Sequence, residues 1–253
     1  MAGGNDRAGT FVEQSPKFFN QGLFAQSAIQ QHPLGTVRAL LDGRCYQYAE
    51  AGGTALAAGK VNQCVAPDAE FNNEVIAAAA AAGDRRIQLT PGSSTAVQNL
   101  FADGYLIIND VDGEGHLYKV KSHLAVTSAT AFWLNIYDAI RVALTTSSEW
   151  TLTVNQQKHL IIGPTTLTGI VAGVSPIVVT ADYFFWNQVR GPAAVLTHDT
   201  LVIGDNVVAS MQNTPVAGAV EQSTEAASIA DVIGRVMHVG ASTEYALINL
   251  CIG

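Results

Sequence analysis

Short runs of hydrophobic and β-branched residues recur along the chain from Gly35 onward, and clusters of Gly, Asp, Asn and Pro separate them. In three places, two such runs flank a turn and predict a β-hairpin. These are residues 36–41 with 44–49, residues 75–82 with 85–90, and residues 105–108 with 117–121. In the first, Asp42-Gly43 lies between the runs, and this pair favours the positive φ angles of a type I′ turn.

Further strands are expected where β-prone residues recur between turn signals. They are residues 131–136, 150–154, 177–180, 183–189, 194–196, 200–203, 207–208, 234–238 and 245–252. Residues 138–144 and 223–232 have room for one or two helical turns, and no stretch shows three turns of amphipathic helix. Short strands at this spacing are typical of β-sandwiches and barrels. The predicted fold is therefore all-β, a short-stranded sandwich or barrel of the β-tulip or jelly-roll kind.

A boundary between two β subdomains is expected where glycine and proline cluster, at residues 163–176. It divides the chain into a β domain at 34–165 and a C-terminal β-barrel-like domain at 166–253. No internal repeat of fixed period is present, which disfavours a solenoid or propeller.

Residues 1–33 differ from the rest because they combine turn formers and glutamine with four phenylalanines that follow no period. The four are Phe11, Phe18, Phe19 and Phe24. Purely disordered tails usually lack aromatic residues. We therefore predict an extended N-terminal arm whose phenylalanines dock on a neighbouring subunit. The alternative, a segment folded back on its own domain, fits the pattern equally well.

The charge content points to a surface that partners cover. Only 13% of the 253 residues are charged and 48% are hydrophobic, whereas an average soluble protein has about 25% charged residues. Depletion of charge is typical of interface cores, so self-association is expected. A surface built from Ser, Thr, Asn and Gln is the alternative.

The same composition argues against several kinds of partner. The net charge is −8 and the basic residues are scattered, so no phosphate-tracking groove and no nucleic-acid partner are expected. The longest apolar run, residues 75–82, is too short to cross a bilayer, and no signal peptide is evident at the N-terminus. Cys45, Cys64 and Cys251 are an odd number without CxxC spacing, which fits packing residues in a protein made in a reducing cytoplasm.

No motif predicts catalysis, so we expect a protein that is not an enzyme and holds no cofactor. P-loop and GxGxxG patterns are absent, and residues 173–177 lack the second glycine of a nucleophile elbow. The six histidines are dispersed without metal-ligand spacing. The acidic stretch 109–116 resembles a calcium loop, but, counting from Asp110, Lys121 stands where the loop's final acid belongs. A hairpin turn explains that stretch without a metal.

The three tryptophans bear on whether the protein binds sugars. Trp133, Trp150 and Trp186 lie far apart among mainly aliphatic neighbours. Core packing is the favoured interpretation for each of them, over a platform for a carbohydrate.

Several stretches resemble β-rich virion proteins that are encoded beside major capsid genes in tailed phages. They are residues 34–37, 42–44, 46, 48–53, 102–106, 113–115, 118–123, 186–193, 202–205, 217–220, 233–236 and 244–250. The chain is similar in particular to head decoration (cement) proteins, although the shared positions are glycines and apolar residues rather than chemical signatures. The N-terminal arm shows no such likeness.

The resemblance implies a structural virion protein on the exterior of an icosahedral capsid, made in the host cytoplasm. It implies that the protein bridges capsomers as a homotrimer and that its partners are itself and the major capsid protein. Alternatives are a tail or fibre component, or the shell protein, although the common phage shell fold needs a long spine helix. A carbohydrate-binding or carbohydrate-cleaving β domain is the alternative from a different class.

Overall fold

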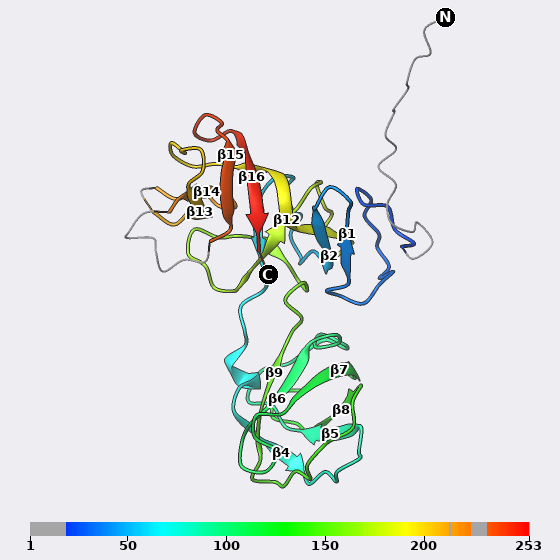
Figure 1. Cartoon of the computed structure of the whole chain (residues 1–253). Coiled ribbons are helices and arrows are strands. Elements are labelled where there is room, and N and C mark those ends of the chain that lie inside the picture. Colours follow the sequence, from blue (N-terminus) through cyan, green and yellow to red (C-terminus); the bar gives the residue numbers. More distant parts are fainter. Residues whose placement is uncertain (1–18, 213, 224–231, 253) are drawn as a thin grey trace, which may run out of the picture. The chain divides into compact units, whose positions relative to one another are not determined.

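A computed structural model describes residues 19–212, 214–223 and 232–252. The chain divides into two compact units (Figure 1): residues 1–64 and 159–253 form unit 1, and residues 65–158 form unit 2. The described residues contain sixteen β-strands and one 3-10 turn, η1 (Ala69–Phe71), and no α-helix. The all-β prediction and the prediction of two β subdomains are therefore confirmed. In the described part of the chain, no helix is long and apolar enough to cross a membrane.

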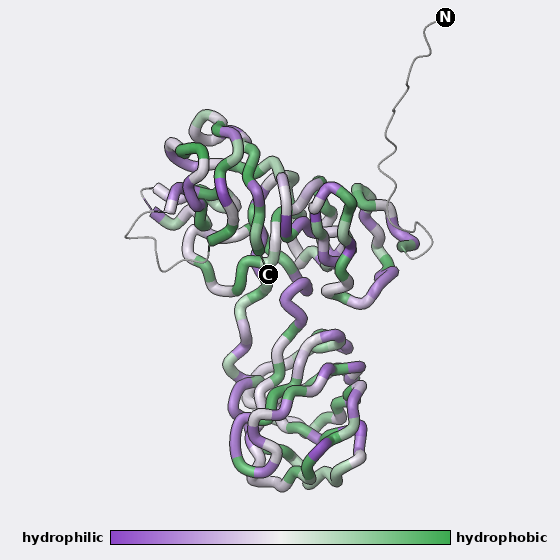
Figure 2. The backbone as a smooth tube through the Cα atoms, viewed as in Figure 1, coloured by the Kyte–Doolittle hydropathy of each residue, from purple (hydrophilic) through white to green (hydrophobic). Residues whose placement is uncertain are grey.

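Unit 2 is a closed six-stranded barrel with the strand order β4-β5-β8-β7-β6-β9. Its strands are β4 (Glu74–Ala78), β5 (Arg86–Leu89), β6 (Tyr105–Asp110), β7 (Leu117–His123), β8 (Phe132–Ile136) and β9 (Glu149–Thr153). Alternate residues point into the barrel, and Figure 2 shows hydrophobic and hydrophilic stretches mixed along its backbone. In β8, for example, Phe132, Leu134 and Ile136 are buried while Trp133 is exposed. Two of the predicted hairpins, β4–β5 and β6–β7, are present here.

Unit 1 is built on a ten-stranded sheet whose main path runs β10-β3-β11-β12-β16-β15-β13-β14. Its strands are β1 (Val37–Ala39), β2 (Cys45–Glu50), β3 (Val61–Gln63), β10 (Ile161–Ile162), β11 (Val171–Val174), β12 (Phe184–Leu196), β13 (Asn206–Ala209), β14 (Val220–Gln222), β15 (Gly234–His238) and β16 (Tyr245–Cys251). The long strand β12 is central to it. Its first half pairs with β2 and its second half pairs with β16.

The first predicted hairpin is confirmed as β1–β2, but its turn differs from the predicted type. Gly43 has a φ of +87°, whereas Asp42 keeps a negative φ and its carboxylate accepts a hydrogen bond from the Arg44 N–H. Because only one turn residue has a positive φ, the turn is not of type I′. The Asp side chain takes over part of the turn's hydrogen bonding instead.

Some strand predictions fail where the decisive pairing is distant in sequence. Residues 183–189 and 194–196 belong to one strand, β12, which continues through Pro192. Residues 177–180 and 200–203 form no strand, and residues 138–144 form no helix. Four short strands, β3, β10, β11 and β14, were not predicted, since none shows alternation: β11, for instance, is buried at all four positions. Most of the predicted helical segment 223–232 lies outside the described residues.

The division of the chain differs from the predicted one. Residues 45–50 were expected to share a domain with residues 65–158, but they form β2, which pairs with β12 in unit 1. Strands β3 and β10 explain how the chain leaves and re-enters unit 1. They pair antiparallel, with Asn62 opposite Ile162 and Gln63 opposite Ile161, so unit 2 occupies the loop of a hairpin.

The predicted arm does not extend to residue 33. Residues 19–33 pack onto unit 1, where Ser27 forms a β-bridge with Phe184. Leu23 and Leu34 share a buried cluster with Tyr46, Tyr48 and Trp186. These hydrophobic side chains find their burial within the same chain, which explains why the segment is ordered without a neighbour.

Candidate interaction surfaces

Phe19 is fixed in unit 1 by aromatic and cationic contacts. Its ring centre lies 5.1 Å from that of Trp186, edge to face. The Arg38 guanidinium, which is only 2% exposed, lies 4.8 Å from the Phe19 ring and 5.3 Å from the Trp186 ring. It also donates a hydrogen bond to the carbonyl of Gln21. Phe19 therefore packs on its own domain, which was the alternative to an arm that docks on a neighbouring subunit. Phe11 and Phe18 lie outside the described residues.

Phe24 is the one described phenylalanine of the predicted four that faces solvent, with 61% of its surface exposed. It lines a hollow of about 450 Å³ on unit 1, here called the Phe24 hollow. The other walls come from Arg44, Tyr46, Ala58, Gly59, Val174, Pro176, Tyr245 and the β12 residues 188 and 192–194. The hollow combines apolar walls with one charged side chain, which suits a protein or peptide contact.

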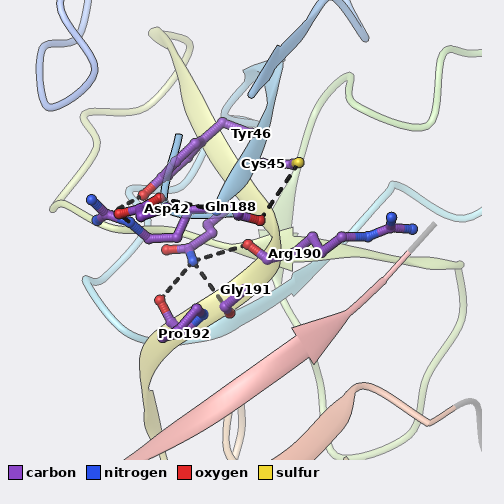
Figure 3. Close-up of polar contacts among 9 residues, drawn as sticks. Asp42, Cys45, Tyr46, Gln188, Arg190, Gly191 and Pro192 are labelled. Carbon is purple, nitrogen blue, oxygen red and sulfur yellow. Dashed lines mark hydrogen bonds and ion pairs between the residues drawn. The ribbon is translucent and has the colours of Figure 1, made fainter. Parts of the chain in front are cut away.

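A bend in β12 shapes the wall of the Phe24 hollow (Figure 3). The Gln188 amide Nε2 donates to the carbonyl of Pro192 at 2.9 Å and to that of Arg190 at 3.2 Å. Gly191 lies between them with a φ of +82°, and a Cβ there would come 2.9 Å from the Arg44 Cα. Only glycine allows both this positive φ and this close approach to Arg44. The bend and the β1–β2 hairpin therefore fix each other's position.

The polar rim of the same hollow comes from the β1–β2 hairpin (Figure 3). The Arg44 Nε donates to the Asp42 carboxylate at 2.7 Å, and the Arg44 Nη1 donates to the Tyr46 hydroxyl at 3.3 Å. Burial acts to raise the pKa of Asp42, but the hydrogen bonds from Arg44 outweigh it and the pKa lies below its ordinary value. Burial raises the pKa of Tyr46 against the opposing charge of Arg44. At neutral pH the rim therefore carries a compensated ion pair.

An exposed apolar strip continues from the hollow across the outer side of the sheet. Alternate residues of β16 face outward, among them Tyr245 and Leu247. Leu247 lies opposite Ala194 of β12 on one side and His238 of β15 on the other. Together with the neighbouring Pro192 and Met237, these residues form what we call the β16 face: Pro192, Ala194, Met237, Tyr245 and Leu247. Exposed apolar side chains that gather on one side of a sheet, here beside the polar His238 and Asn249, are a feature of interaction sites.

Ser210, His198 and Glu221 form a buried cluster that looks like a hydrolase triad and differs from one in geometry. The His198 Nδ1 lies 3.1 Å from the Ser210 Oγ and 3.5 Å from a Glu221 oxygen. In a triad the serine and the acid contact opposite ring nitrogens, so that one nitrogen can take the serine proton while the acid orients the other N–H. Here both contact the same nitrogen, and the Ser210 Oγ also accepts from the Val216 N–H. The cluster ties loop backbone to the sheet.

The acidic turn at 110–116 is organised by its own hydrogen bonds. Asp110 accepts from the Val111 N–H, and the Asp112 carboxylate accepts from the Thr145 hydroxyl. Among the described residues, no group of three His, Cys, Asp or Glu side chains could hold a metal ion. All three cysteines are free thiols: Cys64 is buried, Cys45 is half-buried and Cys251 is exposed. Packing therefore accounts for Cys64 but not for Cys251.

Two of the three tryptophans are buried and one is exposed. Trp150 and Trp186 are fully buried, as expected, whereas Trp133 is 42% exposed on the outside of the barrel. The Arg86 guanidinium lies 4.1 Å from the centre of the Trp133 ring. Both side chains line a second hollow of about 450 Å³, here called the Trp133 hollow. Alternation along residues 131–136 was a signal that Trp133 points outward, since it lies between inward-facing Phe132 and Leu134.

Comparison with known proteins leaves these surfaces without a precedent to guide their interpretation. No protein-family model matches the chain, and no curated protein or solved structure matches it.

Proposed function

We propose that this protein is a structural virion component that decorates and stabilises an icosahedral phage capsid by bridging capsomers as a homotrimer. The observation that carries the proposal is the β16 face together with the Phe24 hollow, an apolar contact surface that unit 1 leaves uncovered. The low charge content and the resemblance of residues 34–253 to decoration proteins support it.

The physical requirements of such a role fit the molecule. A decorating protein acts by shape and apolar complementarity, and a trimer lets several modest contacts act together at an effective concentration in the millimolar range. A stable interface of this sort buries roughly 1,200–2,000 Å² in total. A β-sheet face suits this purpose because its side chains are held on a rigid backbone.

Light scattering after size-exclusion chromatography tests self-association. We expect a trimer at micromolar concentration for the native chain and a monomer for Leu247→Glu, because the substitution puts an unpaired charge into the β16 face. Leu117→Glu is the matched control, since Leu117 is exposed on β7 of unit 2. A native monomer, or equal dissociation by both variants, contradicts the proposed interface.

Particle binding tests the capsid role separately. The native protein should co-sediment with intact phage heads, and deletion of residues 1–18 should weaken that binding while both units stay folded. The deletion removes Phe11 and Phe18 and spares Phe19, which packs within unit 1. A native protein that fails to associate with heads overturns the proposed function.

A further inference from the structure

The Trp133 hollow on unit 2 has the features of a small-ligand site rather than of a protein contact. It is lined by an exposed aromatic ring, a cation, side-chain amides and a few apolar residues, and no acidic residue lines it. Ligand sites combine an apolar surface with a few well-placed polar groups in this way. We propose that this hollow binds an acidic glycan, with a sugar ring stacked on Trp133 and its carboxylate paired with Arg86. This inference goes beyond the capsid role and does not depend on it.

The exposure of Trp133 is the first step of the argument. Trp150 and Trp186 are completely buried, so the fold has the means to bury indole rings. An indole left 42% exposed on a barrel wall retains a large apolar area in contact with water. The C–H face of a pyranose ring is flat and apolar, so stacking on the indole removes both surfaces from water. The Arg86 guanidinium covers one face of this ring, so the platform for a sugar is the part of the indole that Arg86 leaves exposed.

Arg86 supplies the charge preference. Its guanidinium is held over the Trp133 ring, and the described residues provide it with no hydrogen bond or ion pair. The contact with the ring leaves N–H donors available, and their fork geometry matches a carboxylate. His123 also lines the hollow but is already engaged, since Nδ1 lies 2.7 Å from the Leu124 carbonyl and Nε2 accepts from the Phe101 N–H. Arg86 is therefore the cation that a bound carboxylate meets.

The amides of the hollow suit hydroxyl groups. Gln98 and Asn135 each carry both donors and an acceptor, and the Asn135 Nδ2 donates to the Ser122 hydroxyl at 3.1 Å. Sugar hydroxyls both donate and accept hydrogen bonds. A wall that carries amides therefore suits them better than a purely apolar or purely cationic wall does. A nucleic-acid strand also stacks on indole, but its backbone needs a row of cations. The hollow has a single cation, Arg86, which favours an acidic glycan over a nucleic-acid strand.

Isothermal titration calorimetry with the full-length protein tests the binding. The probes are oligosaccharides of galacturonate, of alginate and of hyaluronan, with the methyl ester of each as its uncharged match and an oligo-dT as the nucleic-acid probe. We expect at least one uronate oligosaccharide to bind, and its ester to bind about tenfold more weakly because the pairing with Arg86 is lost. Failure of all three acidic probes, equal binding of the ester, or binding of oligo-dT alone overturns the proposal.

Two substitutions then assign the binding to this hollow. Trp133→Ala and Arg86→Gln should each weaken it about tenfold or more, because one removes the platform and the other the charge. Tyr137→Ala is the matched control, since Tyr137 is an exposed aromatic of unit 2. Arg86→Lys keeps the charge without the fork and should have an intermediate effect. All substituted side chains are exposed, and melting curves check the fold. Unchanged binding by Trp133→Ala, or an equal loss in Tyr137→Ala, contradicts the assignment.

Discussion

The two units solve the problem of sheet edges in different ways. In unit 2 the six strands close into a barrel, so each strand pairs on both sides. In unit 1 the main sheet path ends at β10 and β14, and β1 pairs only with β2. Open edges and an exposed apolar face offer backbone and side chains to a partner. A closed barrel offers side chains alone. This difference agrees with our proposals of protein contacts for unit 1 and a small-ligand hollow for unit 2.

The units also differ in how much of the chain each one needs. Unit 2 is continuous, whereas unit 1 combines segments on both sides of it. Strand β2 has its partner β12 in the later segment, and β3 pairs with β10 and β11 there. Unit 2 is therefore expected to fold on its own, and unit 1 is expected to need both segments.

Ending the chain after Lys158 is the most severe test of this difference. The truncation removes all the strands from β10 onward, which include both partners of β3 and the long partner of β2. We expect unit 1 to lose its structure completely, while unit 2 keeps all six strands. Hydrogen exchange read by mass spectrometry should show amides of residues 45–63 unprotected and those of residues 74–153 protected. Persistent protection of β2 would show that unit 1 does not need its second segment.

The converse deletion is the control for that truncation. Because Gln63 lies opposite Ile161, replacing residues 65–159 by Asn-Gly turns β3 and β10 into a two-residue hairpin. Unit 1 should then fold without unit 2 and unfold cooperatively.

Removing one buried tryptophan from each unit should give the next largest effect. The Trp186 indole donates to the Gln21 carbonyl in unit 1, and the Trp150 indole donates to the Val75 carbonyl in unit 2. Substitution of either by Ala should cost about 3–5 kcal/mol, because a large cavity opens in a packed core. We expect each loss to affect the unfolding of its own unit only, as measured by exchange of amides in urea.

The exposed tryptophan serves as the control for both. Trp133→Ala should change the free energy of unfolding by about 0.5 kcal/mol or less, as is usual for surface positions. If Trp150→Ala or Trp186→Ala destabilised both units equally, the two units would fold as one cooperative unit.

A smaller effect is expected at the bend of β12. Gly191→Ala should destabilise unit 1 by about 1–3 kcal/mol, because the new Cβ combines a strained φ with a close approach to Arg44. Gly43→Ala is the matched comparison: its φ is +87° and a Cβ there meets nothing within 4 Å. It should therefore cost less than Gly191→Ala in thermal unfolding. An equal loss of stability in the two variants would mean that the positive φ alone determines it, with no contribution from the approach to Arg44.

The smallest expected effect is a difference in pH dependence between the units. Burial lowers the pKa of His123 in unit 2, against the Leu124 carbonyl, which acts to raise it. The unfolded chain then binds the proton first, so unit 2 should lose stability as the pH falls below the ordinary histidine value of about 6.5. His32 in unit 1 is shifted in the same direction but is less buried, so unit 1 should respond less. Amide exchange at pH 7 and pH 5 measures both, and a stronger response of unit 1 would contradict this.

Local patterns predicted those elements whose two faces differ. Strand β16 was expected from the β-prone run at residues 245–252, and the structure buries every second residue of it. Strand β11 lacks alternation because both of its faces are covered, and its sequence includes Gly173. The division into units also escaped prediction, because it rests on the pairing of β2 with β12, which no local signal encodes.

The candidate surfaces were predictable to a lesser degree. Phe19 and Phe24 were treated alike from sequence, yet one packs under Trp186 and the other is exposed, since the partner comes from a strand far along the chain. Trp133 carried a usable signal in its alternation, which the general preference of tryptophan for cores outweighed. The cluster around His198 depends entirely on tertiary contacts.

The insertion of unit 2 into a hairpin has a consequence for synthesis on the ribosome. Strand β2 is translated about 130 residues before β12, which at about 5–20 residues per second is an interval of roughly 7–26 s. Tyr46 and Tyr48, fully buried in the finished protein, lack their partner Trp186 throughout it. Unit 2 can mature within the same interval, since its last strand precedes β12. The nascent chain therefore presents a finished barrel beside an aromatic segment that chaperones have time to bind.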